Sequence, residues 1–203
     1  MLQLLLVRTT GCCWFYVSIN KRETDNHIIK QPWADCNKPL PFRKHGVRLD
    51  YYQEFIAACG GRDSLKGLTT TEVNENFVKP ATAHFQSSYC DMLSSQRHAA
   101  VGLLATVFTS HAWKYLFLDV IDALLYHFQD EPGIVVWFDL FSNNQHKAVD
   151  LDFHWWCNTL KTAIEQFGHT VMVLSPWQDP IPLTRAYLNC IAPRIPTVNL
   201  KWR

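Results

Sequence analysis

The chain has 203 residues, of which 48% are hydrophobic and 18% are charged, a composition that excludes a disordered chain and allows one or two small domains with a buried core. Its formal net charge of +1 argues against nucleic acid and an anionic membrane surface as partners. The seven cysteines include no Cys-x-x-Cys pair. They therefore predict reduced thiols in an intracellular, cytoplasmic protein rather than a disulfide framework or a zinc module.

The first 48 residues differ from the rest of the chain. Residues 1–7 are apolar, but Arg8 interrupts them and they are too few for a membrane span. They predict a strand or an unstructured end. A polar run over 21–26 and a proline-rich tract that follows it favour turns and extended chain. We expect low order over residues 1–48.

Short helices are expected over residues 49–100. Apolar residues at helical spacing over 51–59 predict a helix that ends at two glycines. Thr69, with an acidic residue after it, predicts the start of a second helix that ends before Pro80. A third helical piece is expected over 81–93. Together these helices predict an extension ahead of the main domain, which by itself signals no chemistry.

Strands and helices alternate in the second half of the chain. Residues 106–109, 134–138 and 170–174 predict three buried strands, and the second is apolar throughout, as is typical of a central strand covered on both faces. Apolar residues at i, i+3, i+4 spacing predict helices between them, over 116–128 and 153–167. The order βαβαβ predicts an α/β, flavodoxin-like parallel sheet flanked by helices, whose strands end in loops that bind ligands.

Three segments resemble the first three strands of a Toll/interleukin-1 receptor (TIR) domain. They are VFTSHAW at 107–113, VWFD at 136–139 and VMVLSP at 171–176. The resemblance covers roughly 105–189 and implies a TIR-like domain over 101–191, followed by an irregular tail over 192–203.

A closer resemblance is to a TIR-like module found in large multidomain eukaryotic proteins, some of which carry tetratricopeptide or kinesin-light-chain-like repeats. It is carried by SHAWKY at 110–115 and WFDLFSNNQ at 137–145. GLTTTEV at 67–73 also resembles the segment that precedes this module.

The resemblance implies two activities of different classes. TIR domains are self-associating signalling modules, or enzymes that cleave the nicotinamide glycosidic bond of NAD, and some are both. The first activity implies association with copies of this chain or with other TIR-like domains, with no cofactor required. The second implies NAD as the substrate.

In the enzymatic members, a loop after the first strand holds the nucleotide. The resemblance therefore implies nucleotide binding by Ser110, His111, Trp113 and Lys114. An indole at the carboxyl edge of the sheet can stack on a base, and packing against the first helix is the alternative for Trp113. An imidazole there can contact a phosphate or transfer a proton, and a hydrogen-bonded loop residue is the alternative for His111.

The resemblance also implies a catalytic glutamate beyond the Leu-Ser-Pro of 174–176, because a carboxylate stabilises a transition state that resembles an oxocarbenium ion. The expected position falls at Ile191, and no carboxylate follows Asp179. The catalytic residue is therefore unknown, and a catalytically impaired module is expected. The proline-containing tail cannot continue a regular helix, and it lacks the last strands and helices of a TIR domain. A truncated, non-functional fragment is a third interpretation.

The loop after the second strand helps TIR domains to pack on one another. In this chain it implies an interaction surface at Phe141, Asn143 and Asn144. A mobile lid and an ordinary solvated loop are the alternatives. An exposed Phe141 would favour association.

A metal site is not expected. His154 and Cys157, at i, i+3 spacing near Asp152, are placed to present two ligands on one face of a helix. The sequence offers no obvious third and fourth ligand, so we interpret this segment as a polar helix start with a buried thiol.

Overall fold

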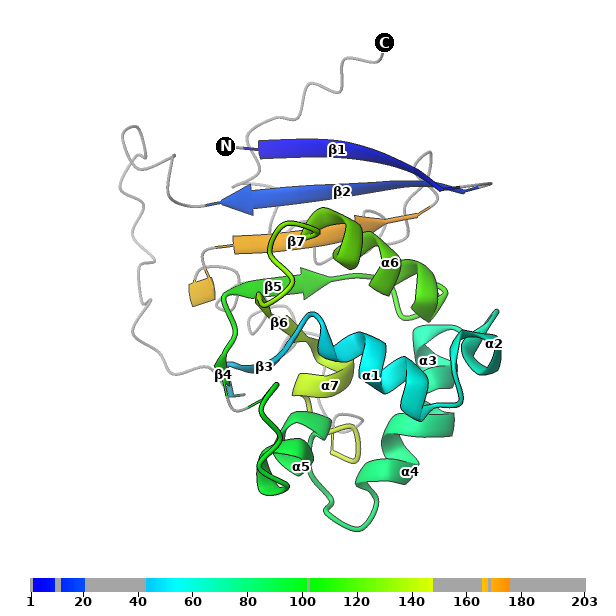
Figure 1. Cartoon of the computed structure of the whole chain (residues 1–203), viewed down its shortest axis with the longest axis vertical. Helices are drawn as coiled ribbons and strands as arrows, with labels where there is room; N and C mark the ends of the chain where they lie inside the picture. Colours follow the sequence, from blue (N-terminus) through cyan, green and yellow to red (C-terminus); the bar gives the residue numbers. More distant parts are fainter. Residues whose placement is uncertain are drawn as a thin grey trace.

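The computed structural model describes residues 43–101, 103–147, 166–167 and 169–175, together with the backbone of strands β1 (Leu2–Thr9) and β2 (Cys12–Asn20). Within this part of the chain, a seven-stranded mixed sheet runs in the order β1-β2-β7-β5-β6-β3-β4, and helices flank it (Figure 1). The predicted α/β, flavodoxin-like fold class is confirmed.

The centre of the sheet is parallel. Strand β5 (Val107–Ser110) lies between β6 (Val135–Phe138) and β7 (His169–Leu174) and runs parallel to both. Every residue of β6 is buried, as its apolar sequence predicts for a central strand. Because β6 and β7 lie on opposite sides of β5, the chain changes direction across the sheet at this strand. In open α/β sheets, ligands bind at the carboxyl edge beside such a point.

Antiparallel strands extend the sheet on both sides. Strand β2 pairs with β7, and β1 pairs with β2. On the other side, β3 (His45–Arg48) pairs with β6 and with the two-residue edge strand β4 (Leu103–Leu104). Three of these strands thus fall within residues 1–48, where we expected low order, and β1 agrees with the strand interpretation of residues 1–7.

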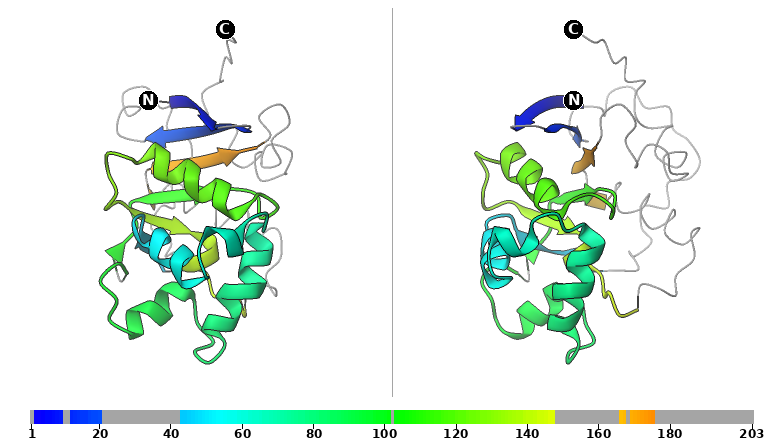
Figure 2. Two further views of the ribbon diagram at one scale, coloured as in Figure 1. Left: turned by 45° about the vertical axis from the view of Figure 1, so that its right-hand side comes forward. Right: turned by 90° about the vertical axis from the view of Figure 1, so that its right-hand side faces the viewer.

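Two helices lie on the same face of the sheet (Figures 1 and 2). Helix α6 (Phe117–His127) follows β5 and confirms the helix expected over 116–128. Helix α1 (Tyr51–Ala58) ends ahead of Gly60 and Gly61, whose φ angles of 93° and 90° lie in the left-handed region that glycine adopts without strain.

The remaining helices follow α1 in short pieces. They are α2 (Arg62–Leu65), α3 (Thr70–Val73), the π-helical turn η2 (Asn74–Val78), α4 (Lys79–Thr82) and α5 (Tyr89–Ser95). Thr69 and Glu72 form a capping box at α3, as the sequence suggests. The expected end before Pro80 is wrong, because α3, η2 and α4 follow one another without a break. Pro80 lacks the backbone N–H that a regular α-helix would use, and the π-helical turn η2 directly before it departs from the regular α-helical hydrogen-bond pattern.

The helices of residues 49–100 share one core with the sheet. Side chains such as Phe55 of α1 and Phe117 of α6 pack with Val107, Val136 and Phe138 of the strands. The opposite face holds a second cluster in which the rings of Phe108 and Trp137 stack at 5.0 Å. The expected helical extension is therefore a covering layer of the sheet, because its apolar side chains have no core of their own.

Candidate functional site

Three segments meet at the carboxyl edge of the parallel strands. They are the loop after β5, the one-turn helix α7 (Asp139–Ser142) that directly follows β6, and the start of α3. The backbone N–H groups of Thr70 and Thr71 donate to the carbonyl oxygens of Tyr115 and Trp113, at 3.0 and 3.1 Å. Helix α3 therefore lies against the loop that the sequence predicts to bind a nucleotide.

His111 lies under α3. Its side chain is 1% exposed, and Nε2 forms a 3.1 Å hydrogen bond with the hydroxyl of Thr70. The ring packs on Phe138 with centroids 4.7 Å apart, and Nδ1 lies 3.8 Å from Asp139 Oδ1. A hydroxyl, an imidazole and a carboxylate in this order resemble the groups of a catalytic triad. However, Thr70 is fully buried, so its hydroxyl cannot reach a substrate in this conformation.

Trp113 lies beside this cluster and is anchored from two directions. Its indole N–H donates a 2.6 Å hydrogen bond to Asp139 Oδ2, and its ring is partly buried against the main core. Hydrogen bonds to an ionised acceptor are stronger than those between neutral groups. The indole thus links the loop after β5 to the residue that follows β6.

The other two residues of the predicted nucleotide site have different surroundings. Ser110 ends β5 and is half-buried, whereas Lys114 is exposed. Next to them, the Tyr115 hydroxyl accepts a 2.9 Å hydrogen bond from the backbone N–H of Ser175. This bond joins the loops after β5 and β7 at the point where the chain changes direction across the sheet. The structure therefore gathers His111 and Trp113 around Asp139 and leaves Lys114 at the surface.

Sequence reasoning missed Thr70 and Asp139, the two partners that hold this cluster together. Asp139 is the first polar residue after an apolar strand, and that position at the carboxyl edge is a signal that identifies it. Its side chain is 25% exposed, while Oδ1 is buried and makes no hydrogen bond within the described part of the chain. Thr70 has no comparable signal, because its partner His111 is 41 residues away.

The predicted interaction loop requires a correction at Phe141. This side chain is fully buried, and its ring lies 4.8 Å from that of Phe55 and 5.0 Å from that of Tyr89. The turn of α7 directs it into the core, so Phe141 cannot contribute to an exposed contact surface.

The two asparagines of this loop also form hydrogen bonds within the protein. Asn143 is buried, and its backbone N–H donates to the carbonyl oxygen of Asp139. Asn144 donates to the carbonyl oxygen of Gln86 at 2.7 Å and accepts from the backbone N–H of His146 at 3.0 Å. The bond to Gln86 joins this loop to the turn that follows α4.

The edge strand β4 presents large apolar side chains to solvent. Leu103 is 43% exposed and Leu104 is 67% exposed. Ala105 donates its backbone N–H to the Lys44 carbonyl oxygen at 2.8 Å, and the next residue pair is Leu104 opposite His45. In an antiparallel ladder, hydrogen-bonded and non-hydrogen-bonded pairs alternate. The backbone N–H and C=O of Leu104 therefore point away from β3, toward the outside of the sheet.

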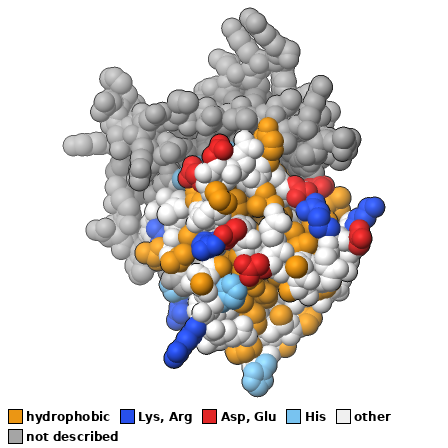
Figure 3. Space-filling model, in the orientation of Figure 1, with side chains coloured by type: hydrophobic (Ala, Val, Ile, Leu, Met, Phe, Trp, Pro, Cys, Tyr) orange, Lys and Arg blue, Asp and Glu red, His pale blue; other side chains and the backbone are white. Residues whose placement is uncertain are grey.

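The charged and thiol side chains of the described residues do not mark a second site. On the face shown in Figure 3, acidic and basic side chains are interspersed rather than gathered by sign. Burial raises the pKa of Cys59 to about 11 and the pKa of Cys90 to about 12, which disfavours the thiolate form of both at neutral pH. Within the described ranges, no group of three or more His, Cys, Asp or Glu side chains is placed to hold a metal ion. The segment of Asp152, His154 and Cys157 lies outside those ranges, as does Ile191.

Comparison with family models, curated proteins and solved structures finds no match to this chain. Among the helices of the described residues, none has the length and apolar composition that a membrane crossing requires.

Proposed function

We propose that this chain is an association module of the TIR-like kind, which pairs with a second copy of itself through the edge strand β4. The observation that carries the proposal is Leu104, a large apolar side chain that is 67% exposed on a strand at the edge of the sheet. Exposed apolar surface on a sheet edge is a preferred site for pairing with another strand.

The backbone geometry supports pairing with an identical edge. The outward N–H and C=O of Leu104 are the groups through which an added antiparallel strand forms its ladder. In a dimer with two-fold symmetry, each edge meets the same edge of its partner. The exposed leucines of both copies would then cover one another. Each Å² of apolar surface that is buried in this way stabilises the dimer by about 25 cal/mol.

The internal hydrogen bonds at the carboxyl edge of the sheet favour association over catalysis. His111 is buried and bonded to Thr70, and the Trp113 indole N–H is bonded to Asp139. A ligand site uses a few placed polar groups that contact the ligand and fix its orientation. In this chain the same residues instead join α3, β5 and β6.

Sedimentation velocity over a range of protein concentrations tests the proposal. We expect the wild type to dimerise with increasing concentration and Leu104→Asp to remain monomeric, because a charge on each edge opposes their approach. Tyr126→Asp is the matched control, since Tyr126 is exposed to 44% on α6, away from the edge. A monomeric wild type, or equal dimerisation by Leu104→Asp, would overturn the proposal.

NAD cleavage is a second candidate function, which one observation favours. Asp139 supplies a partly exposed carboxylate beside Trp113 and His111, at the carboxyl edge where this fold class binds ligands. Incubation with NAD followed by measurement of free nicotinamide tests it. Release that Asp139→Asn abolishes and Asp122→Asn leaves unchanged would support this activity, and no release from the wild type at high protein concentration would exclude it.

A further inference from the structure

The turn that leads from α5 into β4 is held by one imidazole. The ring nitrogen Nδ1 of His98 accepts a 3.2 Å hydrogen bond from the backbone N–H of Ala100. Because this nitrogen accepts, it carries no hydrogen, and the ring proton of neutral His98 lies on Nε2. A protonated imidazole has two donors and no acceptor. The bond to Ala100 therefore exists only while His98 is neutral.

Ala100 is bonded on both sides of its backbone. Its N–H donates to His98, and its carbonyl oxygen accepts a 3.0 Å hydrogen bond from the backbone N–H of Arg48 in β3. Ala100 is 4% exposed, so water has little access to an N–H that loses its acceptor. Three residues later, Leu103 pairs with Gly46 of β3. The imidazole thus fixes the peptide through which the chain enters the edge strand.

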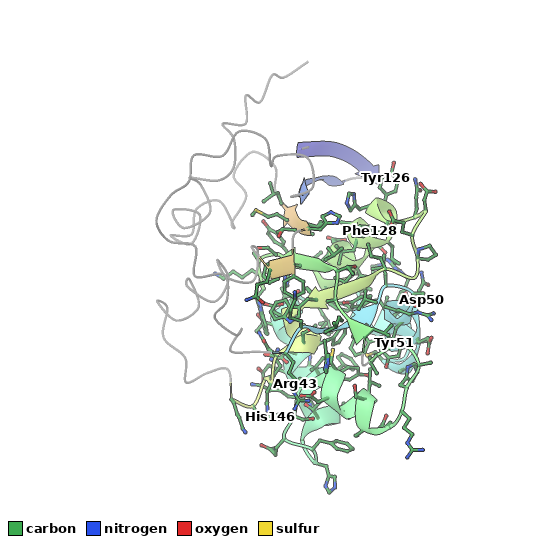
Figure 4. All side chains as sticks on the ribbon, turned by 90° about the vertical axis from the view of Figure 1, so that its left-hand side faces the viewer. Arg43, Asp50, Tyr51, Tyr126, Phe128 and His146 are labelled. Atoms are coloured by element: carbon green, nitrogen blue, oxygen red, sulfur yellow. The ribbon has the colours of Figure 1, made fainter. Side chains whose placement is uncertain are left out.

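The side chains that face this imidazole come from helix α1. Nε2 lies 3.5 Å from Oε2 of Glu54, which is the charged group within ion-pair distance of the ring among the described residues. Tyr51, labelled in Figure 4, packs against the ring in a T-shaped arrangement with centroids 4.8 Å apart. The neighbouring cations are Arg97, the preceding residue, which is exposed, and Arg48, whose guanidinium donates to Asp50.

Protonation of His98 has two opposing effects. It makes the approach to Glu54 an ion pair, but the Glu54 side chain is 62% exposed, and exposed ion pairs contribute little to stability. It also removes the acceptor of a buried N–H and places a second donor against it, which is the more costly change. The loss at Ala100 therefore outweighs the gain at Glu54.

We propose that His98 makes the position of β4 sensitive to acid. While His98 is neutral, its ring holds the Ala100 peptide, and with it the start of β4, against β3. When acid protonates the ring, the turn over residues 98–101 opens and the edge strand loses its attachment at that end. Association through β4 would then weaken at low pH, and this consequence alone rests on the proposed function.

Hydrogen exchange of residues 97–106 at about pH 7.5 and about pH 5 tests the proposal, after correction for the intrinsic exchange rate. Histidine side chains change charge within this interval. We expect the protection of the segment to fall about fivefold or more at the lower pH, the factor that corresponds to the loss of one typical hydrogen bond. In His98→Asn, the amide oxygen can accept in place of Nδ1 but does not titrate, so we expect equal protection at both pH values.

Two further variants separate His98 from other titrating groups. His84→Asn replaces an exposed histidine outside this turn and should respond to acid as the wild type does. Glu54→Gln removes the ion pair and should keep or increase the response, because it removes the gain that opposes the opening of the turn. A response that Glu54→Gln abolishes would overturn the proposal, since the carboxylate would then be its cause.

Equal protection of the wild type at the two pH values would overturn the proposal, as would an equal fall of protection in His98→Asn. If His98→Asn does not fold, nuclear magnetic resonance of the wild type decides. Exchange of the Ala100 amide that rises as the His98 ring is protonated would support the proposal, and exchange that does not follow the ring would contradict it. A wild type that sedimentation shows to be monomeric would overturn the proposed association only, because exchange reports on the single copy.

Discussion

The indole N–H of Trp113 donates a 2.6 Å hydrogen bond to Asp139 Oδ2, and this bond joins the loop after β5 to the residue that follows β6. The same carboxylate lies 3.8 Å from His111, whose other ring nitrogen binds Thr70 of α3. Groups that a ligand would contact in many sheets of this class instead contact one another. The hydrogen bonds at the carboxyl edge therefore link the sheet to the helix α3 that covers it.

Replacing Trp113 with Phe should destabilise the chain by about 1–2 kcal/mol, because it removes a hydrogen bond to a charged acceptor that water partly reaches. Urea unfolding measures the change. Asp139→Asn keeps an acceptor for the indole and should cost less. In a double-mutant cycle with Asp139→Ala, which removes the acceptor, we expect Trp113→Phe and Asp139→Ala to be coupled. Fully additive effects would show that the bond contributes nothing.

Thr70→Val should reduce stability by about 1–3 kcal/mol, because it removes the hydroxyl that pairs with buried His111. Thr71→Val is a matched control in the same turn. The Thr71 hydroxyl donates to the Trp113 carbonyl oxygen at 3.2 Å, but this bond is exposed, so its loss should change the free energy of unfolding by about 0.5 kcal/mol or less. Thermal unfolding of both variants provides the comparison, and equal losses would contradict the role of the Thr70–His111 bond.

Phe141→Ala should destabilise the chain by about 3–5 kcal/mol, because it empties a fully buried aromatic site. Phe85→Ala should cost about 0.5 kcal/mol or less, since Phe85 is 44% exposed. Chemical denaturation measures both. A loss of stability below about 1 kcal/mol for Phe141→Ala would indicate that Phe141 lies at the surface, as the sequence-based hypothesis proposed.

Gly46→Ala should be poorly tolerated within strand β3. A Cβ at this position would meet the Val136 carbonyl oxygen and would lie 2.8 Å from the Cβ of Ala105. We expect a loss of about 1–3 kcal/mol, the typical cost of overpacking. Gly133 has no atom within 4 Å of such a Cβ, so Gly133→Ala should be neutral or slightly stabilising. Similar unfolding midpoints for the two variants would refute the tight approach of β3 to β6.

The centre of the fold could be predicted from the sequence because its signals are local. Strands β6 and β7 carry continuous apolar runs, helix α6 has an apolar face at helical spacing, and β5 begins with Val107 and Phe108. Strand β3 could not be predicted in this way, because its four residues include only one large apolar side chain, Val47. It is a strand because it pairs with β6, far along the chain.

The candidate site also has residues whose place could be predicted from the sequence and residues whose place could not. His111 and Trp113 follow a recognisable strand, so their place at the carboxyl edge could be predicted. Their bonds to Thr70 and Asp139 span 41 and 26 residues, and local patterns carry no information about such pairs. Phe141 was misplaced for a related reason. Its polar neighbours suggest a solvated loop, while its actual surroundings come from Phe55 and Tyr89 of distant helices.

Hydrogen exchange across residues 99–106 as a function of protein concentration tests edge pairing most directly. If two copies pair through β4, the outward N–H of Leu104 becomes hydrogen-bonded in the dimer, and exchange of this segment should slow as the concentration rises. Peptides from α6 should show no such change, because α6 is distant from the edge (Figure 1). Exchange of residues 99–106 that is independent of concentration, in a sample that sedimentation shows to be dimeric, would contradict association through β4.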